Sequence, residues 1–370
     1  MRKIFGFMMA LSLAIFFGAA GYCGEEWPTF RGGAARTGAV PAQATQYHAR
    51  GDVVWETYFQ QPIQSSPALS GGAVYFGSDD GGFYAVSASS GETLWTFRTE
   101  NWISSSPAVY GDTVMFGAYD GKFYALDKRT GKLKWQHTTH NSVASSPAAA
   151  NGYAYFGGID GNVYCVDIST GWQKWSYTAG REVFGSPAMS DGTVYIGNHD
   201  GKMMAIDASS GKLKWRAIVG GPITACPAVS NGMLYFGSWD GKLYTAEIKH
   251  QAVIRTFDSG GSIESSPLAA NGKVFFGNIR GTLYAIDAVT GNVSWTVETG
   301  ARIASSPALS AGILYFGNDN GSVYAVNAQN GSVIWKIDTG GAIVTAPAIG
   351  PGGIYVTAAD GRSGALRYIK

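Results

Sequence analysis

Short runs of alternating apolar and polar residues, separated by glycine-containing turns, recur every forty residues along this chain. In one repeat these runs are residues 103–109, 113–117, 121–127 and 132–137. Asp120-Gly121 and Thr130-Gly131 stand at two of the turns. Asp-Gly favours a tight hairpin because glycine readily adopts a positive φ. Each repeat therefore predicts four antiparallel strands.

One proline marks the period and shows that the repeats contain no net insertion. It occurs at Pro67, Pro107, Pro147, Pro187, Pro227, Pro267, Pro307 and Pro347. A repeat of about forty residues is the size of a four-stranded β-propeller blade. Because proline has no N–H to donate and small residues surround it, we expect this run to form the innermost strand, facing the central channel.

The two ends of the repeat region complete one another. Residues 53–57 match the fourth strand, since Trp55 precedes Trp95 by forty positions, and residues 346–348, 353–356 and 364–368 match the first three. A shared blade closes the ring and removes exposed sheet edges. The sequence therefore predicts an all-β fold over residues 51–370, an eight-bladed propeller of four-stranded antiparallel blades. The N-terminal outer strand pairs with the three C-terminal strands and so closes the ring.

A different kind of segment precedes the repeats. Arg2 and Lys3 are followed by an apolar run over residues 4–20, so we interpret residues 1–24 as a secretory signal peptide and residues 25–50 as a leader packed on the propeller. The alternatives are an uncleaved membrane anchor, because the run is nearly long enough to span a bilayer, and lipidation of Cys23. Tyr22 argues against lipidation, because a lipobox has a small residue there. We expect an exported protein of the periplasm or cell envelope.

Composition narrows the choice of partners. The net charge is +1, the pI is near 7.7 and 14% of the residues are charged. This composition lacks the excess of positive charge by which proteins bind nucleic acid or an anionic membrane surface. Cys165 and Cys226 stand where most other repeats have alanine or serine, so we interpret them as small buried residues, not as a disulfide or a metal site. We expect a monomer without a metal.

The segment Ala125-Leu126-Asp127-Lys128-Arg129-Thr130-Gly131-Lys132-Leu133-Lys134-Trp135 resembles the tryptophan-docking repeat of pyrroloquinoline-quinone (PQQ) type propellers. The resemblance extends from about residue 51 to the C-terminus, and residues 27–32 resemble the leader of many such propellers. The superfamily includes quinoprotein alcohol dehydrogenases and the non-enzymatic outer-membrane assembly factor BamB. The tryptophans recur with the period, which assigns a structural docking role to Trp55, Trp95, Trp135, Trp175, Trp215, Trp295 and Trp335.

The sequence departs from the enzymes of this superfamily. Quinoprotein dehydrogenases resemble longer chains with a vicinal cysteine pair, a calcium-binding Glu/Asn set and a catalytic Asp, and none of these can be located here. We therefore expect neither enzymatic activity nor a cofactor, with PQQ and calcium as the alternative.

One column of the repeat varies far more than the rest. Before the Asp-Gly turn the blades carry Asp79, Tyr119, Ile159, His199, Trp239, Ile279, Asp319 and Ala359, and the loops between blades diverge likewise. Both segments open on the same face of a propeller. Aromatic residues and arginine anchor many protein interfaces. We predict a partner-binding face formed by Trp102, Tyr119, Arg181, Glu182, Phe184, His199, Trp239, Glu264, Arg280, Arg302 and Asp319.

These features lead to a functional hypothesis. We expect an exported non-catalytic scaffold, similar in kind to BamB, that binds an envelope protein or peptide through this face. The first alternative is a binder of PQQ or another small molecule, as in a degenerate quinoprotein dehydrogenase, and the second is carbohydrate binding by the same aromatic residues. The remaining alternative is that exposed loop tips diverge without any binding role.

The fifth repeat departs from the others. Gln251 and Arg255 replace the glycine and tryptophan of the docking motif, and Arg280 in the next repeat replaces the aspartate of the Asp-Gly turn. The sequence therefore predicts that the outer strand of the fifth blade is the least regular, and that residues 249–251 form a local interaction feature.

Overall fold

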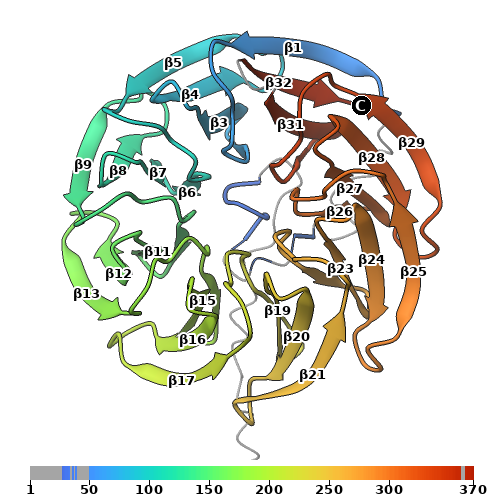
Figure 1. The fold of residues 1–370 in the computed structure, drawn as a ribbon. Helices are drawn as coiled ribbons and strands as arrows, with labels where there is room; N and C mark the ends of the chain where they lie inside the picture. The colour runs from blue at the N-terminus through green and yellow to red at the C-terminus, as the bar shows by residue number, and fades with distance from the viewer. Residues whose placement is uncertain (1–26, 34–35, 37, 40–49, 360–362) are drawn as a thin grey trace, which may run out of the picture.

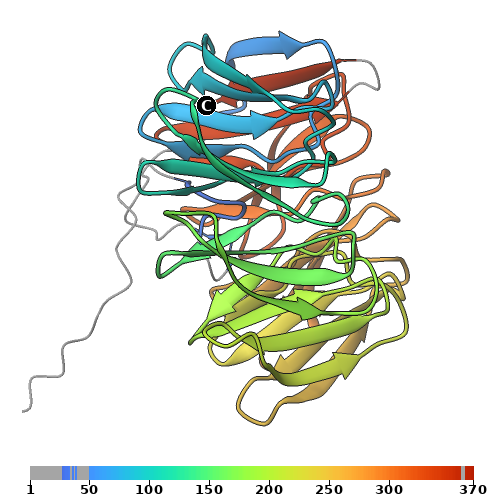
Figure 2. The ribbon, with the colours of Figure 1, turned by 90° about the vertical axis from the view of Figure 1, so that its left-hand side faces the viewer.

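The computed structural model describes residues 27–33, 36, 38–39, 50–359 and 363–370, and these residues form an all-β ring. Their strands make eight four-stranded antiparallel sheets, arranged as blades around a central axis (Figure 1). Figure 2 shows the ring from its side, as a thick disc. The signal peptide predicted at residues 1–24 lies outside the described residues. Within the described ranges no helix is long and apolar enough to cross a membrane.

The strands of each blade run in sequence order from the axis outward, except that β1 completes the last blade. Blades 1 to 4 consist of β2 Ala68–Ser70, β3 Ala73–Gly77, β4 Gly82–Ser87 and β5 Thr93–Arg98; β6 Ala108–Tyr110, β7 Thr113–Gly117, β8 Lys122–Asp127 and β9 Leu133–Thr138; β10 Ala148–Ala150, β11 Tyr153–Gly157, β12 Asn162–Asp167 and β13 Gln173–Thr178; and β14 Ala188–Ser190, β15 Thr193–Gly197, β16 Lys202–Asp207 and β17 Leu213–Ile218. Blades 5 to 8 consist of β18 Ala228–Ser230, β19 Met233–Gly237, β20 Lys242–Glu247 and β21 Ala252–Asp258; β22 Leu268–Ala270, β23 Lys273–Gly277, β24 Thr282–Asp287 and β25 Val293–Glu298; β26 Ala308–Ser310, β27 Ile313–Gly317, β28 Ser322–Asn327 and β29 Val333–Asp338; and β30 Ala348–Gly350, β31 Gly353–Ala359, β32 Gly364–Ile369 and β1 Val53–Phe59.

The innermost strand is shorter than its sequence pattern predicts. In blade 2 the pattern predicts a strand over residues 103–109, whereas β6 covers only Ala108–Tyr110 and begins after Pro107. The preceding residues form the connection from one blade to the next, since proline has no N–H to offer a sheet ladder. The inner strands of neighbouring blades contact one another around the axis, as expected from their small residues. The other three strands agree with the prediction to within one residue at each end.

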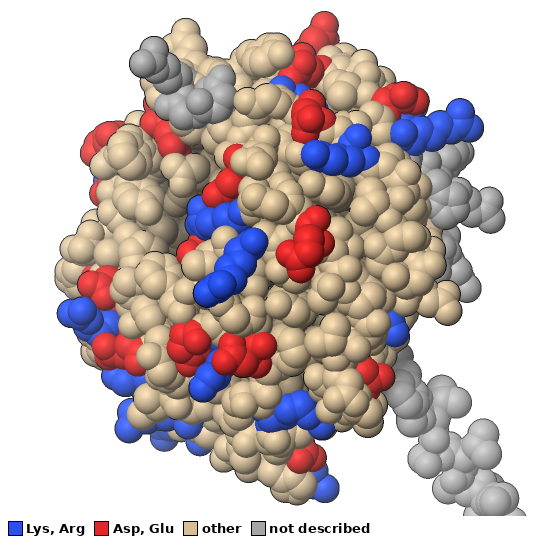
Figure 3. Space-filling view, turned by 45° about the vertical axis from the view of Figure 1, so that its right-hand side comes forward, with Lys and Arg blue, Asp and Glu red and all other residues tan. Residues whose placement is uncertain are grey.

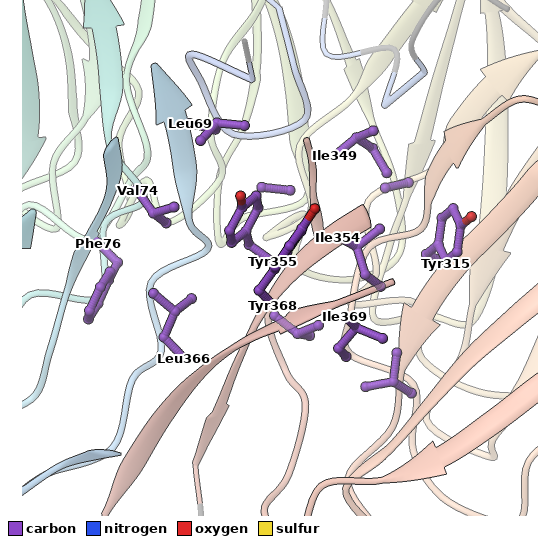
Figure 4. Packing of buried hydrophobic residues seen from close by; sticks show 14 of the residues in the cluster. Leu69, Val74, Phe76, Tyr315, Ile349, Ile354, Tyr355, Leu366, Tyr368 and Ile369 are labelled. Carbon is purple, nitrogen blue, oxygen red and sulfur yellow. The ribbon is translucent and has the colours of Figure 1, made fainter. Parts of the chain in front are cut away.

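Pairing of β1 with β32 closes the ring, as the sequence predicts. Trp55 lies opposite Tyr368 and Phe59 opposite Gly364 in this antiparallel pair. A buried apolar cluster fills the space between blade 8 and its two neighbours (Figure 4). Its members from blades 1, 7 and 8 include Leu69, Val74, Phe76, Tyr315, Ile349, Ile354, Tyr355, Leu366, Tyr368 and Ile369. The two ends of the described propeller are therefore held together by both a sheet and a core.

Tryptophans on the outer strands join each blade to the next. The indole N–H of Trp95 donates to the carbonyl of Lys128 in blade 2 at 3.2 Å, and that of Trp135 donates to Ile168 in blade 3 at 2.8 Å. Trp55, Trp175 and Trp295 form the same bond to Ala88, Ala208 and Ala328. A Cβ on Gly131 would stand 2.5 Å from the ring of Trp95, so the indole needs the glycine of the neighbouring turn.

The predicted irregularity of the fifth blade's outer strand is wrong. Strand β21 is seven residues long, and its pairing with β20 has the single register shift that other outer strands also show. Gln251 adopts the positive φ of the glycine it replaces, at 55°. The guanidinium of Arg255 donates to the carbonyls of Ala288 at 3.4 Å and Val289 at 2.6 Å, so it replaces the indole as a donor to the next blade. Within residues 249–251, His250 Nδ1 lies 2.7 Å from Glu247 Oε2.

A second set of bonds joins the blades close to the axis. In each of these bonds, the residue before the proline that recurs every forty residues donates its backbone N–H to a serine hydroxyl. That serine stands at the same position in the next blade, as in the bond from Ser66 to Ser106 at 2.9 Å. Six such links run from Ser66, Ser106, Ser146, Cys226, Ser266 and Ala346 to Ser106, Ser146, Ser186, Ser266, Ser306 and Ser66. The other two positions in the ring would need a hydroxyl at Cys226 and Ala346, and neither residue has one.

Restoring one missing link should stabilise the ring. In the variant Ala346→Ser a hydroxyl becomes available to the N–H of Ser306, so we expect the free energy of unfolding to rise by about 1 kcal/mol, the usual contribution of one internal hydrogen bond. Chemical denaturation measures this change. The reciprocal variant Ser106→Ala removes an existing link and should lower the free energy by a similar amount. A loss of stability in both variants would contradict the proposed geometry of the ring.

Candidate functional site

One backbone bond brings the two variable segments of every blade together. The N–H of Tyr119 donates to the carbonyl of Trp102 at 2.9 Å, and that of His199 donates to Glu182 at the same distance. The equivalent bond occurs in all eight blades, always between residues seventeen positions apart. We call the variable face the surface formed by residues 61–64 and 78–81 of blade 1 and those of their counterparts at forty-residue intervals that the structure describes. Since the bond uses only backbone atoms, the fold leaves these side chains free to differ.

An aromatic cluster spans blades 4 and 5 on this face. The ring centroids of Phe184 and His199 lie 5.4 Å apart, and His199 meets Trp239 edge to face, also at 5.4 Å. The indole N–H of Trp239 donates to Thr224 Oγ1 at 2.9 Å, yet its side chain remains 41% exposed. Three predicted site residues are therefore in contact, and a hydrogen bond fixes the orientation of the most prominent one.

A second aromatic pair lies in blade 2. The rings of Trp102 and Tyr119 are 6.1 Å apart, and Trp102 is 55% exposed. Ser142 of the next blade donates its hydroxyl to the carbonyl of Tyr119 at 2.9 Å, which fixes the loop that carries the tyrosine. These two residues form a second, separate aromatic patch on the same face.

Charged residues of both signs pair across blades 6 and 7. Arg302 lies between two carboxylates, with Nε 3.1 Å from Glu264 Oε2 and Nη1 3.0 Å from Asp319 Oδ2. Burial opposes the charged form of Arg302, but the bonds and charges of Glu264 and Asp319 prevail and raise its pKa. The three predicted residues therefore satisfy one another's charge.

The remaining predicted residues are more loosely placed. Arg181 Nε is 3.6 Å from Glu182 Oε2 and 3.7 Å from Asp200 Oδ1, and His199 Nδ1 is 3.9 Å from the same Glu182 oxygen. Arg280 is exposed, and its side-chain carbons lie against Gly261 of the same blade. Neither arrangement aligns a proton donor and acceptor at hydrogen-bonding distance, so neither has the geometry of a general acid–base pair.

Gln64 and Thr224, which are not among the predicted site residues, also shape this face. Gln64 donates to Asp79 Oδ2 at 2.7 Å in blade 1, while Asp79 Oδ1 is buried without a hydrogen-bond partner. Thr224 supports Trp239 as described above. Gln64 and Thr224 belong to a column that also contains Phe184 and Glu264, so comparison of blades at that position could have identified them.

The leader crosses the inside of the ring. Trp27 exchanges two backbone hydrogen bonds with Leu69 at 2.8 Å each, and the N–H groups of Val109 and Leu309 donate to Pro28 and Gly38. Figure 1 shows this segment, in blue, between the inner strands at the centre of the ring. The described part of the leader therefore covers inner-strand edges in blades 1, 2 and 7 that would otherwise face the channel.

A small cavity remains above the leader. It measures about 170 Å³, and its lining runs from Phe30 of the leader, past the ring of serine hydroxyls and Cys226, to Gln64, Thr224 and Glu264 on the variable face. Cavities that enclose small organic ligands are usually of about 300–1,000 Å³. The described residues contain no group of three His, Cys, Asp or Glu side chains that could hold a metal ion. The residues of this cavity therefore do not fit PQQ with calcium.

Two buried cysteines and a second cavity are further candidates for chemistry or binding. Cys165 and Cys226 are both buried and unpaired, and burial raises the pKa of the Cys165 thiol to about 12. A larger cavity of about 750 Å³ lies between blades 6 and 7, with Lys273, Asn327 and Phe275 among its lining residues. On the side of the molecule seen in Figure 3, acidic and basic side chains are interspersed among mostly uncharged ones.

Two family models match the sequence. The model described as the β-propeller of beta-alanine-activating enzyme matches residues 44–232, just over half of the chain, and the model described as outer membrane protein assembly factor BamB matches residues 218–307 and 279–367. The chain therefore belongs to the PQQ-type β-propeller repeat proteins, as its docking repeats predict. No curated protein matches the sequence.

Solved structures show the same fold. BamB from Moraxella catarrhalis is 22% identical with a TM-score of 0.72, over 85% of this chain and 97% of that chain. Quinohemoprotein alcohol dehydrogenase from Comamonas testosteroni is 15% identical with a TM-score of 0.82, over 95% and 81%. The computationally designed protein Ika8 is 20% identical with a TM-score of 0.74, over 88% and 98%. At these identities the similarity establishes the fold alone, because one propeller fold carries unrelated functions.

The buried carboxylate of blade 1 should make stability depend on pH. Burial raises the pKa of Asp79 above its ordinary value of 3.8, so the carboxyl favours folding in its protonated form and this contribution is lost as pH rises through the folded pKa. The variant Asp79→Asn stays neutral. We therefore expect it to unfold with a higher free energy than the native chain at neutral pH, and the difference to vanish below about pH 3.8.

Chemical denaturation at a series of pH values measures this difference. Asp319→Asn is the matched control, because Asp319 pairs with Arg302 and its loss should lower stability at neutral pH. A difference between Asp79→Asn and the native chain that does not change with pH would show that the carboxyl charge is not the cause.

Proposed function

We propose that this protein is an exported, non-catalytic propeller scaffold that binds a protein or peptide partner through its variable face. The BamB family match supports a scaffold of this kind, since BamB is by its description an outer membrane assembly factor. The signal peptide expected at residues 1–24 supports export to the periplasm or cell envelope. The partner we propose is accordingly another envelope protein.

The observation that carries this proposal is the aromatic cluster of Phe184, His199 and Trp239. Three ring side chains from two blades are packed together at a surface where the backbone bond requires no particular side chain. Exposed aromatic residues held in a fixed orientation are the usual centre of binding energy in protein interfaces, because they lose little conformational freedom on binding. Trp102 offers a second such anchor on the same face.

The chemistry of the described residues supports binding over catalysis. Arg302 is fully paired with Glu264 and Asp319, and the Cys165 thiol is both buried and held protonated by a pKa of about 12. A thiol in that state is a poor nucleophile. The mixed signs of charge around the aromatic cluster suit a partner that is itself polar at the rim of its binding site and apolar at the centre.

Site-specific photocrosslinking in the native host tests this function. A photoreactive residue in place of Trp239 should capture a discrete envelope protein, which mass spectrometry identifies. The matched control is Trp172, which is 79% exposed in the hairpin between β12 and β13 on the opposite face. Capture of the same protein from both positions, or of none from position 239, would overturn the proposed interface.

The double variant Trp102→Ala and Trp239→Ala extends the test to affinity. We expect at least a tenfold loss of affinity for the captured partner with an unchanged melting temperature, since each exposed anchor contributes about 1–2 kcal/mol to such interfaces. Trp172→Ala should leave affinity unchanged.

A small-molecule binder is the second candidate function. The cavity of about 750 Å³ between blades 6 and 7 favours it, because its volume lies within the usual range for ligand sites. For PQQ with calcium, however, the central cavity of about 170 Å³ is smaller than the usual ligand site, which favours the scaffold over a quinone binder. We therefore expect tryptophan fluorescence to stay constant when both are added to the protein, and a saturable change would favour the quinone alternative.

A further inference from the structure

Six buried hydroxyl groups converge on the central cavity. Ser66, Ser106, Ser146, Ser186, Ser266 and Ser306 all line it, and each is more than nine-tenths buried. The oxygen of each hydroxyl already accepts a backbone N–H from the preceding link of the ring, which leaves one lone pair and the O–H donor. None of the six donates to an acceptor in the part of the chain described. The cavity wall is therefore a ring of hydrogen-bond donors.

Buried positive charge lies directly behind this wall. Arg31 is 1% exposed and Arg36 is fully buried. Arg31 donates Nη2 to the carbonyl of Pro267, and Arg36 donates Nε to that of Pro187 at 3.1 Å. Each of these prolines directly follows a serine of the ring, so both guanidinium groups lie close to the hydroxyls.

Among the described residues Arg31 has no carboxylate partner. Its Nε and Nη1 atoms are buried without a hydrogen-bond partner, and it forms no ion pair with a carboxylate among the described residues. Burying an unpaired charge is costly, and burial lowers the pKa of Arg31 to about 10. Glu264, a carboxylate that itself lines the cavity, is already paired with Arg302. Among the described residues, a backbone carbonyl and the Cys226 thiol, both uncharged, therefore hold this cation inside the ring.

We propose that the central cavity binds a small inorganic anion, either a halide or a tetrahedral oxyanion, through the serine hydroxyls in front of Arg31. Donors directed inward and a positive charge behind them are the two elements of an anion site. A volume of about 170 Å³ admits such an ion with a few water molecules and excludes larger organic anions. Water alone would satisfy the hydroxyls but would leave Arg31 without a counter-charge. This site is independent of partner binding on the variable face.

Thermal unfolding of the full chain at constant ionic strength tests the proposal. We expect sodium bromide, chloride or phosphate to raise the melting temperature by several degrees relative to sodium gluconate, because an ion that binds in the cavity stabilises the folded state. The response should be lost in Arg31→Gln. It should weaken in Ser106→Ala, which removes one hydroxyl from the cavity. It should persist in Ser105→Ala, because the Ser105 hydroxyl donates instead to the carbonyl of Ser145 in the next blade.

Anomalous diffraction locates the ion. Crystals soaked in bromide or selenate should show one anomalous peak within hydrogen-bonding distance of the ring of hydroxyls, and the ion that gives the peak distinguishes a halide site from an oxyanion site. If Arg31→Gln does not fold, this measurement and the serine variants still decide the question. Equal melting temperatures in all salts together with water density alone in the cavity would overturn the proposal, as would a salt response unchanged by the serine variant.

Discussion

Closure of the ring is the constraint on which the rest of this structure depends. Each blade contacts only its two neighbours and the central segment, so a missing neighbour would expose both a sheet edge and an apolar face. The pairing of β1 with β32 removes both, because it places the first strand beside the last and covers the core that joins blades 7, 8 and 1. The strand order of the blade is repeated around the circle that this pairing closes.

Two concentric sets of bonds maintain the spacing of the blades. Near the axis, a backbone N–H meets the serine hydroxyl of the next blade, and at the periphery an indole N–H meets a carbonyl of the next outer hairpin. The outer bond tolerates a change of chemistry, since Arg255 forms it where the tryptophan is absent. The bond that holds the variable face uses backbone atoms only, which explains how one repeat can keep its geometry while its exposed side chains differ completely.

The leader makes the centre of the ring unlike the centre of a simple repeat array. Two arginines of the leader bind the carbonyls of Pro267 and Pro187, each of which directly precedes an inner strand. This interaction breaks the symmetry of the ring, because a single segment pairs with only some of the blades. The variable face and the leader together make a protein of nearly identical units asymmetric on its surface and at its axis.

The sequence alone determined the repeat, the number of blades, the composite closing blade and the position of the innermost strand, because local patterns of two to five residues return at a fixed interval. It did not determine that β6 begins only after Pro107, or that β21 stays regular. The first depends on where the inner strand starts to pair with β7, and the second on carbonyls supplied by the next blade. The contact of His199 with Trp239 was equally beyond it. These two residues lie on different blades, and only the rotation from one blade to the next decides which side chains meet. The burial of Arg31 depends on how the leader crosses the ring, and no periodic pattern encodes a segment that occurs once.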